Sequence, residues 1–163
     1  MKHTSPFLKW AGGKRWLTET LYNLPLPPFT RYIEPFLGSG AIFFHLRPSQ
    51  SVLSDLNREL IDTYCAIRDD WRAVFRRLVI HQDKHSKSYY YRVRSTEPAD
   101  KDERAARFIY LNRSCWNGLY RVNRAGKFNV PIGTKTQIVL PTDNFSDVAN
   151  ILTHTQLHAG DFA

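Results

Sequence analysis

The sequence predicts an α/β fold, in which a small parallel sheet carries a mainly helical insertion with a β-hairpin. Residues 31–34 form a β-prone run that leads through a Gly-x-Gly turn at 38–40 into a helix over 41–46. A second strand is expected over 51–54, and a strand, a helix and a parallel strand form a right-handed βαβ unit. From residue 57 onward the apolar residues recur at helical spacing instead.

The elements before the first strand are a turn and a helix. Residues 7–14 are expected to form an extended entry and a glycine turn. A helix should follow and run to about Asn23, because the proline-rich stretch 24–28 cannot continue it.

The middle of the chain is expected to be helical. Apolar residues follow i, i+1, i+4 spacing over 60–68 and again over 74–79. A short helix or turn is expected at 89–91. A longer helix should run from Pro98 to about Trp116, because proline suits a first turn and the acidic residues after it match the helix dipole.

The last third returns to strands. Residues 123–126 predict a hairpin turn between strands over 119–122 and 127–130. A final helix near 145–152 then precedes a third short strand over 155–158.

Positive charge is concentrated in the middle of the chain. The 163 residues suffice for one moderate core, and their formal net charge is +8. Between residues 57 and 130 there are 16 Lys and Arg against 9 Asp and Glu. This asymmetry indicates a polyanionic partner, most commonly nucleic acid, although a generic solvated surface would have the same composition.

The sequence favours a reducing, cytoplasmic compartment. No apolar run approaches the roughly 20 residues of a membrane-spanning helix, and the first residues lack the apolar stretch of a signal peptide. Cys65 and Cys115 match no metal-ligand spacing, so we expect two free thiols. His81 and His85 are expected on a solvated face, without a third metal ligand.

Two acidic residues near the glycine turn indicate which kind of ligand it would bind. Such turns bring backbone N–H groups close to a ligand, although many need glycine for steric reasons only. Glu34 would repel a phosphate and attract an ammonium group or hydroxyls. Asp55 follows the turn by some 15 positions, near the spacing of about twenty at which an acidic residue reaches ribose hydroxyls. The alternative is that Asp55 caps the next helix.

A second motif lies near the start of the chain. Residues 10–14 combine an aromatic side chain, two glycines and Lys14 at the start of a helix. Lys14 is not expected to be a Walker-type phosphate lysine, because the first glycine and the following Ser or Thr of that motif are absent. A phosphate-binding NTPase is therefore disfavoured.

Polar and aromatic residues gather between positions 113 and 127. Arginine pairs with guanine, asparagine can pair with adenine, and lysine mostly meets phosphates. An aromatic side chain at this junction could pack in the core or wedge into a base stack. Core packing and a solvated face are the alternatives for each residue, but their concentration favours DNA readout by Arg113, Trp116, Asn117, Tyr120, Arg121, Asn123, Arg124 and Lys127.

With these residues in view, the chain resembles the Dam/DpnII type of DNA adenine-N6 methyltransferase along essentially its whole length. Four motifs occur in the family order, which is far more specific than any one of them. They are Lys-Trp-Ala-Gly-Gly-Lys at 9–14, Glu-Pro-Phe-Leu-Gly-Ser-Gly at 34–40, Ser-Asp-Leu-Asn at 54–57, and Asn-Gly-Leu-Tyr-Arg-Val-Asn at 117–123 with Phe-Asn-Val-Pro at 128–131.

The resemblance implies a partial Rossmann-like S-adenosylmethionine-dependent fold and adenine in duplex DNA, within GATC-type sites, as substrate. Residues 1–56 and 146–163 would form the cofactor-binding core, and 57–145 the target-recognition region. The cofactor would contact Trp10, Ala11, Gly12, Lys14, Glu34, Pro35, Phe36, Gly38, Ser39, Gly40, Asp55, Asp161 and Phe162. DNA would contact Lys9, Trp116, Asn117, Leu119, Arg121 and Pro131, besides Arg113, Asn123 and Arg124 from the polar–aromatic cluster.

The chain departs from the family pattern in one respect. Family members carry Asp-Pro-Pro-Tyr shortly after the Gly-Asp-Phe stretch, here at 160–162, to hold the flipped adenine, and residues 1–163 contain no such tetrapeptide. We therefore expect an N-terminal part of a methyltransferase, with a bare, apolar sheet edge, that is inactive alone. A separate chain or a downstream segment would supply the rest. The alternatives are a non-catalytic DNA-binding module and one half of a split enzyme.

Overall fold

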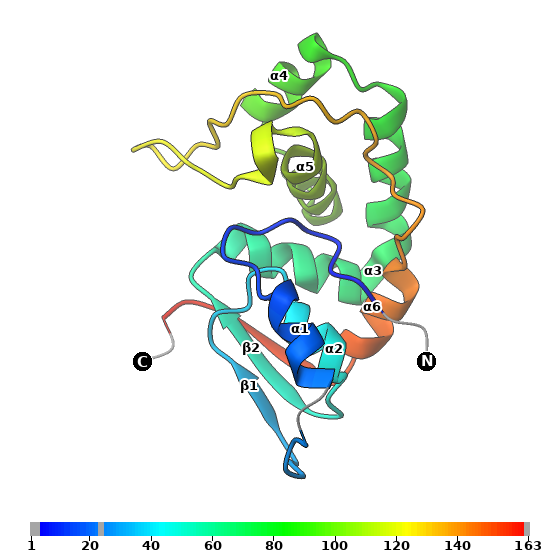
Figure 1. Ribbon diagram of the computed structural model, residues 1–163. Coiled ribbons are helices and arrows are strands. Elements are labelled where there is room, and N and C mark those ends of the chain that lie inside the picture. The colour runs from blue at the N-terminus through cyan, green and yellow to red at the C-terminus, as the bar shows by residue number, and fades with distance from the viewer. Residues whose placement is uncertain (1–3, 23–24, 162–163) are drawn as a thin grey trace.

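The computed structural model describes residues 4–22 and 25–161 (Figure 1). Three parallel strands form one sheet in the order β1-β2-β3, with Ile33 opposite Val52 and Leu53 opposite Leu157. The elements, in chain order, are α1 (Arg15–Tyr22), β1 (Tyr32–Glu34), α2 (Ala41–Leu46), β2 (Ser51–Asp55), α3 (Arg58–Asp83), α4 (Lys87–Ser95), α5 (Lys101–Ser114), the 3-10 turn η1 (Trp116–Gly118), α6 (Phe145–Leu152) and β3 (Thr155–Ala159).

The α/β prediction is confirmed, and the three strands of the sheet lie close to their predicted ranges. Helices α1 and α2 lie on one face of the sheet, and α6 returns the chain to it before β3 (Figure 1). The core between them is closed by fully buried side chains, among them Phe43, Phe44, Leu53 and Tyr64. The two apolar periods predicted after residue 57 form one long element, α3.

Helix α3 leads from the sheet to the helical part of the molecule and bends on the way. Asp70 has non-helical backbone angles (φ −151°, ψ 75°), and its side chain accepts a hydrogen bond from the Ala73 N–H at 3.0 Å. The carboxylate thus caps a new first turn inside the helix, which explains the bend. Beyond it, α3 packs against α5, whose residues from Ala105 to Ser114 are all buried.

The predicted hairpin is wrong in its strands, although its turn is present. The chain reverses at 123–126, where the Asn123 N–H donates to the Lys127 carbonyl at 2.9 Å. Antiparallel pairing around this turn is limited to two isolated bridges, between Val122 and Phe128 and between Cys115 and Ile132. Residues 121–127 are all exposed, so no apolar face is buried there to hold a regular ladder of strands.

Strand β1 lies at one edge of the sheet. Among residues 4–22 and 25–161 it pairs with β2 alone, and its Ile33 side chain is 63% exposed. An edge of this kind is open to pairing with a further strand. Within residues 4–22 and 25–161, no helix is long and apolar enough to cross a membrane.

Candidate functional site

The glycine turn after β1 is tied to the end of β2. The Gly38 N–H donates to Asp55 Oδ2 at 3.0 Å, and the Leu37 N–H donates to the Ser54 carbonyl at 2.9 Å. Gly38 and Gly40 have φ of +50° and +64°, which side chains rarely adopt. A Cβ on Gly38 would also lie 2.8 Å from Cδ1 of Trp10, so glycine lets the Trp10 ring approach the turn.

A cavity of about 270 Å³ opens at the carboxyl ends of β1 and β2, where ligands of open parallel sheets bind. The sequence motifs at 10–14 and 34–40 and Asp55 meet in its wall. Three lining residues are absent from the predicted set, Gly13, Leu37 and Ala41, although each adjoins a predicted motif residue. The whole lining is Trp10, Ala11, Gly12, Gly13, Lys14, Glu34, Phe36, Leu37, Gly38, Ser39, Ala41 and Asp55.

Glu34 is the buried acidic group of this cavity. Its side chain is 8% exposed, accepts a hydrogen bond from the Tyr32 hydroxyl at 2.9 Å, and lies 3.9 Å from Lys14 Nζ. Burial raises the pKa of the Glu34 carboxyl, an effect that the Tyr32 hydroxyl and the Lys14 ammonium partly offset. The carboxylate is thus held where a positively charged ligand group would stabilise it.

Asp55 supports the turn and does not cap helix α3. Its Oδ1 accepts the Asn57 N–H at 3.0 Å, and its Oδ2 accepts the Gly38 N–H. The cap of α3 is Asn57, whose side chain accepts the Leu60 N–H at 3.0 Å. The capping alternative for Asp55 is therefore wrong. Each carboxylate oxygen retains acceptor capacity for a ligand hydroxyl at the cavity wall.

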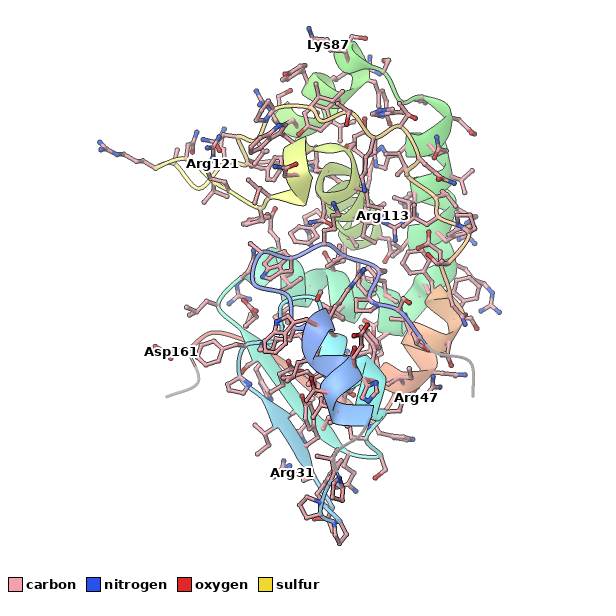
Figure 2. All side chains as sticks on the ribbon, viewed as in Figure 1. Arg31, Arg47, Lys87, Arg113, Arg121 and Asp161 are labelled. Atoms are coloured by element: carbon pink, nitrogen blue, oxygen red, sulfur yellow. The ribbon has the colours of Figure 1, made fainter. Side chains whose placement is uncertain are left out.

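Four predicted cofactor residues lie outside this lining. Pro35 and Gly40 belong to the turn itself, and Gly40 caps α2. Asp161 is exposed beyond the end of β3, as Figure 2 shows. Phe162 lies outside the described residues.

A second cavity, of about 300 Å³, lies on the other side of the Trp10 loop. It brings Lys9 of the entry segment together with Asn117 and Leu119, so three predicted DNA-contact residues share one wall. Lys9 is held there by the Asn112 side chain, which bonds to both its N–H (2.9 Å) and its carbonyl (2.7 Å). The two cavities share Trp10, Ala11, Gly13 and Ser39.

Three cationic side chains, Lys9, Arg15 and Lys135, lie close together near this second cavity. Burial and the neighbouring Lys135 and Arg15 cations lower the pKa of the Lys9 ammonium. All three side chains are exposed, so they present positive charge to solvent. The sequence did not predict that Lys135 lies near Lys9, because the two are 126 positions apart and no local motif marks Lys135.

The predicted DNA contact by Arg113 is wrong. Its guanidinium is buried and pairs with Asp143 at 2.6 Å, while it also donates to the carbonyls of Phe7 and Ile138. Figure 2 shows Arg113 inside the helical part of the molecule. The last turn of α5 faces the interior, which the composition of residues 113–127 does not reveal.

Most other predicted DNA residues are exposed around η1 and the turn at 123–126. Trp116 is 53% exposed. Arg121 lies on the exposed segment 121–127, which projects from the helices (Figure 2). Asn123 is exposed, but its Oδ1 accepts the Ala125 and Lys127 N–H groups, so this oxygen builds the turn. Asn117, Arg124 and Pro131 are exposed, and Leu119 is half-buried.

Two further observations delimit the site. A larger hollow of about 520 Å³ lies at the opposite, amino ends of the strands, lined by Arg31, 49–51, His154 and Gln156, and contains none of the predicted motifs. Over the described ranges, no group of three or more His, Cys, Asp or Glu side chains gathers in a way that could hold a metal ion.

Comparisons with known proteins agree on one family. A family model described as D12 class N6 adenine-specific DNA methyltransferase matches residues 10–163. Type II methyltransferase M1.LlaDCHI of Lactococcus lactis subsp. cremoris is 37% identical over 96% of this chain and 58% of its own length. Type II methyltransferase M.MjaIII of Methanocaldococcus jannaschii is 36% identical over 96% of this chain and 62% of its own. The DNA adenine methylase of Escherichia coli K12 is 37% identical over 82% and 49%.

These matches cover nearly the whole chain. The chain spans about half to three fifths of the length of these relatives. Because the family model covers residues 10–163, which include the whole lining of the first cavity, most of the second and the projecting segment, the chain belongs to the D12 class of N6 adenine-specific DNA methyltransferases.

Proposed function

We propose that this chain binds S-adenosylmethionine in the cavity beside Glu34 and Asp55, and duplex DNA with a GATC-type site on residues 57–145. It would thereby serve adenine-N6 methylation at the nucleoid in the cytoplasm. The observation that carries the proposal is that two distant acidic residues meet in one cavity at the carboxyl ends of parallel strands. The family membership supports the same assignment.

The chemistry of the cavity fits this cofactor better than a nucleotide phosphate. Two carboxylates in the wall would repel a phosphate, whereas they can accept hydrogen bonds from an ammonium group and from ribose hydroxyls. Lys14 Nζ, 3.9 Å from Glu34, is the cation available for a ligand carboxylate. When bound, S-adenosylmethionine supplies an electrophilic methyl group. The residues of this chain would hold and orient it.

The DNA part of the proposal rests on charge and exposure. Lys9 and Arg15 line the second cavity, Lys135 lies near Lys9, and the exposed Arg121 follows the lining residue Leu119 by two positions. Exposed arginine and lysine side chains supply the salt-dependent, phosphate-directed part of DNA binding. The exposed Trp116 ring could fill the space of a displaced base. The GATC preference comes from the resemblance of the motifs at 117–131.

Methyl transfer itself is expected to need more than residues 1–163. The Asp-Pro-Pro-Tyr tetrapeptide, with which the family holds the adenine amine, does not occur among them. We propose that this chain binds both ligands but methylates GATC duplexes little on its own. Supply of the tetrapeptide by a downstream segment or a separate chain would restore the activity.

Calorimetric titration with S-adenosylmethionine tests the cofactor assignment. Glu34→Gln keeps an acceptor for the Tyr32 hydroxyl but removes the charge, so we expect an affinity about 10- to 100-fold lower, the effect of one lost charge-assisted hydrogen bond. Asp55→Asn should weaken binding similarly. Asp62→Asn on the exposed face of α3 is the matched control and should bind like the parent chain.

Two results would contradict the assignment. One is an affinity unchanged in Glu34→Gln, and the other is DNA binding without any cofactor binding, which would favour the non-catalytic module. Because burial disfavours the charged Glu34 carboxyl, Glu34→Gln should not lower the thermal midpoint at neutral pH. A melting curve thus separates lost binding from lost structure.

A further inference from the structure

Tyr120, which the sequence placed among the residues that read DNA, lies between Leu119 and Arg121, but its side chain turns inward. Its ring is stacked on Trp10 with a centroid distance of 5.6 Å and an interplanar angle of 25°. Its hydroxyl donates to Glu59 Oε2 at 2.7 Å. The side chain is thus fixed at both ends, although it lines neither the cofactor cavity nor the second cavity.

Trp10 connects Tyr120 to the cofactor cavity. The Trp10 ring lines both cavities and lies against Gly38 of the glycine turn. It also stacks on Phe108 of α5 at 6.2 Å. A ligand in the cofactor cavity would therefore restrict the ring on which Tyr120 packs.

Glu59 connects Tyr120 to the other wall of the same cavity. It lies in the first turn of α3, four positions after Asp55 and two after the cap Asn57. Burial and the nearby Glu59 carboxylate raise the pKa of the Tyr120 phenol, so it remains a hydrogen-bond donor at neutral pH. Tyr120 thus contacts the two separate segments, 10–14 and 55–59, that flank the cavity.

Arg121 follows Tyr120 directly in the chain and belongs to the predicted DNA-contact residues. Its Nε donates to Asn129 Oδ1 at 2.9 Å, and its backbone carbonyl accepts the Asn129 N–H at 3.1 Å. Asn129 therefore holds the Arg121 side chain, and the Arg121 backbone follows directly on that of Tyr120. The remainder of the projecting turn, residues 122–127, is exposed.

We propose that Tyr120 is a positioning residue that couples occupation of the cofactor cavity to the placement of Leu119 and Arg121 on DNA. This inference rests on the proposed function. A bound cofactor orders Trp10 and the 55–59 segment, these hold Tyr120, and Tyr120 fixes the DNA-contact segment before DNA arrives. Each ligand then strengthens the binding of the other by the same factor, because coupling between two sites is reciprocal.

Paired binding curves measure this coupling on the 163-residue chain. The affinity for a fluorescent GATC duplex is determined by anisotropy with and without saturating S-adenosylhomocysteine, which carries no transferable methyl group. We expect the parent chain to bind the duplex at least about fivefold more tightly in its presence, within the usual range for coupled sites. Tyr120→Leu, which removes both the stack and the hydroxyl, should bring this ratio to about one.

Two further variants keep the outcome interpretable. Tyr120→Phe retains the stack and loses only the bond to Glu59, so it should fold like the parent and lower the ratio at least about twofold. Tyr89→Leu on α4 is the matched control, because the half-buried Tyr89 contacts His81 and Tyr110 and neither cavity. It should keep the ratio of the parent chain. A residue with a purely structural role would change both affinities and leave their ratio unaltered.

The possible failures are distinguishable. If both ligands bind the parent chain with a ratio of one, or if Tyr120→Leu and Tyr120→Phe keep the full ratio, the coupling role of Tyr120 is wrong and the proposed function stands. If S-adenosylhomocysteine does not bind the parent chain at all, the proposed function fails and the coupling fails with it.

Discussion

Arg113 and Arg121 have the same side chain and lie eight positions apart, but they act in opposite ways. Arg121 is exposed on the projecting segment, whereas Arg113 joins α5 to the entry segment through Phe7 and to the returning chain through Ile138 and Asp143. The sequence could not show which of the two arginines is buried, because the carboxylate that pairs with Arg113 lies 30 positions away.

Breaking this buried pair should be costly. Arg113→Ala leaves the Asp143 carboxylate, which is 6% exposed, without its cation, and we expect the free energy of unfolding to fall by about 3–5 kcal/mol. Urea denaturation followed by circular dichroism measures this loss. Arg124→Ala on the exposed turn is the control and should change stability by less than about 0.5 kcal/mol. Equal stabilities of the two variants would show that the Arg113–Asp143 pair is not structural.

At the scale of elements, the sequence predicted most helices and strands because local signals define them. The apolar period changes at residue 57, prolines lie beside α1 and α5, and side-chain caps start α3, α4, α5 and α6. The hairpin strands failed because a ladder needs a buried face, which no local turn signal provides. The bend at Asp70 was also missed, since an aspartate within an amphipathic run reads as a solvated residue.

The junction of α3, α4 and α5 corrects a further prediction. His81 is not on a solvated face. It is 9% exposed, stacks on Tyr110 at 4.7 Å between centroids, and its Nδ1 lies 2.8 Å from the Tyr89 hydroxyl. Burial, with Arg107 and Lys84 nearby, lowers the pKa of His81 to about 4.

This shift predicts a pH dependence of stability. Below about pH 6.5 the unfolded chain protonates His81 while the folded chain keeps it neutral, so stability falls as the pH drops toward 4. The loss approaches about 1.4 kcal/mol per pH unit within that window. Urea midpoints measured between pH 4 and pH 7 should fall less steeply for His81→Phe, which retains a ring against Tyr110.

The matched control for this experiment is an exposed histidine. His154→Phe should follow the slope of the parent chain, because His154 is exposed before β3. If His81→Phe showed the same slope as His154→Phe, the buried neutral imidazole would not be the cause of the acid sensitivity.

At the scale of the whole molecule, the entry segment joins the sheet to the helical part (Figure 1). Thr4 and Asp147 are joined by Arg47 near α6, and Asn112 holds Lys9 against α5. These contacts link positions 43 to 103 residues apart, which periodicity and caps cannot reveal. The motifs predicted that Glu34 and Asp55 would share a site, because both follow parallel strands. They could not predict that the Trp10 loop separates this site from a second cavity.

The assignment of the cofactor to the cavity beside Glu34 and Asp55 is the claim on which the account depends. Amide chemical shifts of the isotope-labelled chain, recorded while S-adenosylmethionine is added, test it most directly. We predict saturable shifts that centre on Gly13, Gly38, Ser39 and Asp55. Shifts that centre instead on the larger hollow around Arg31 and His154, at the opposite end of the sheet, would contradict the account.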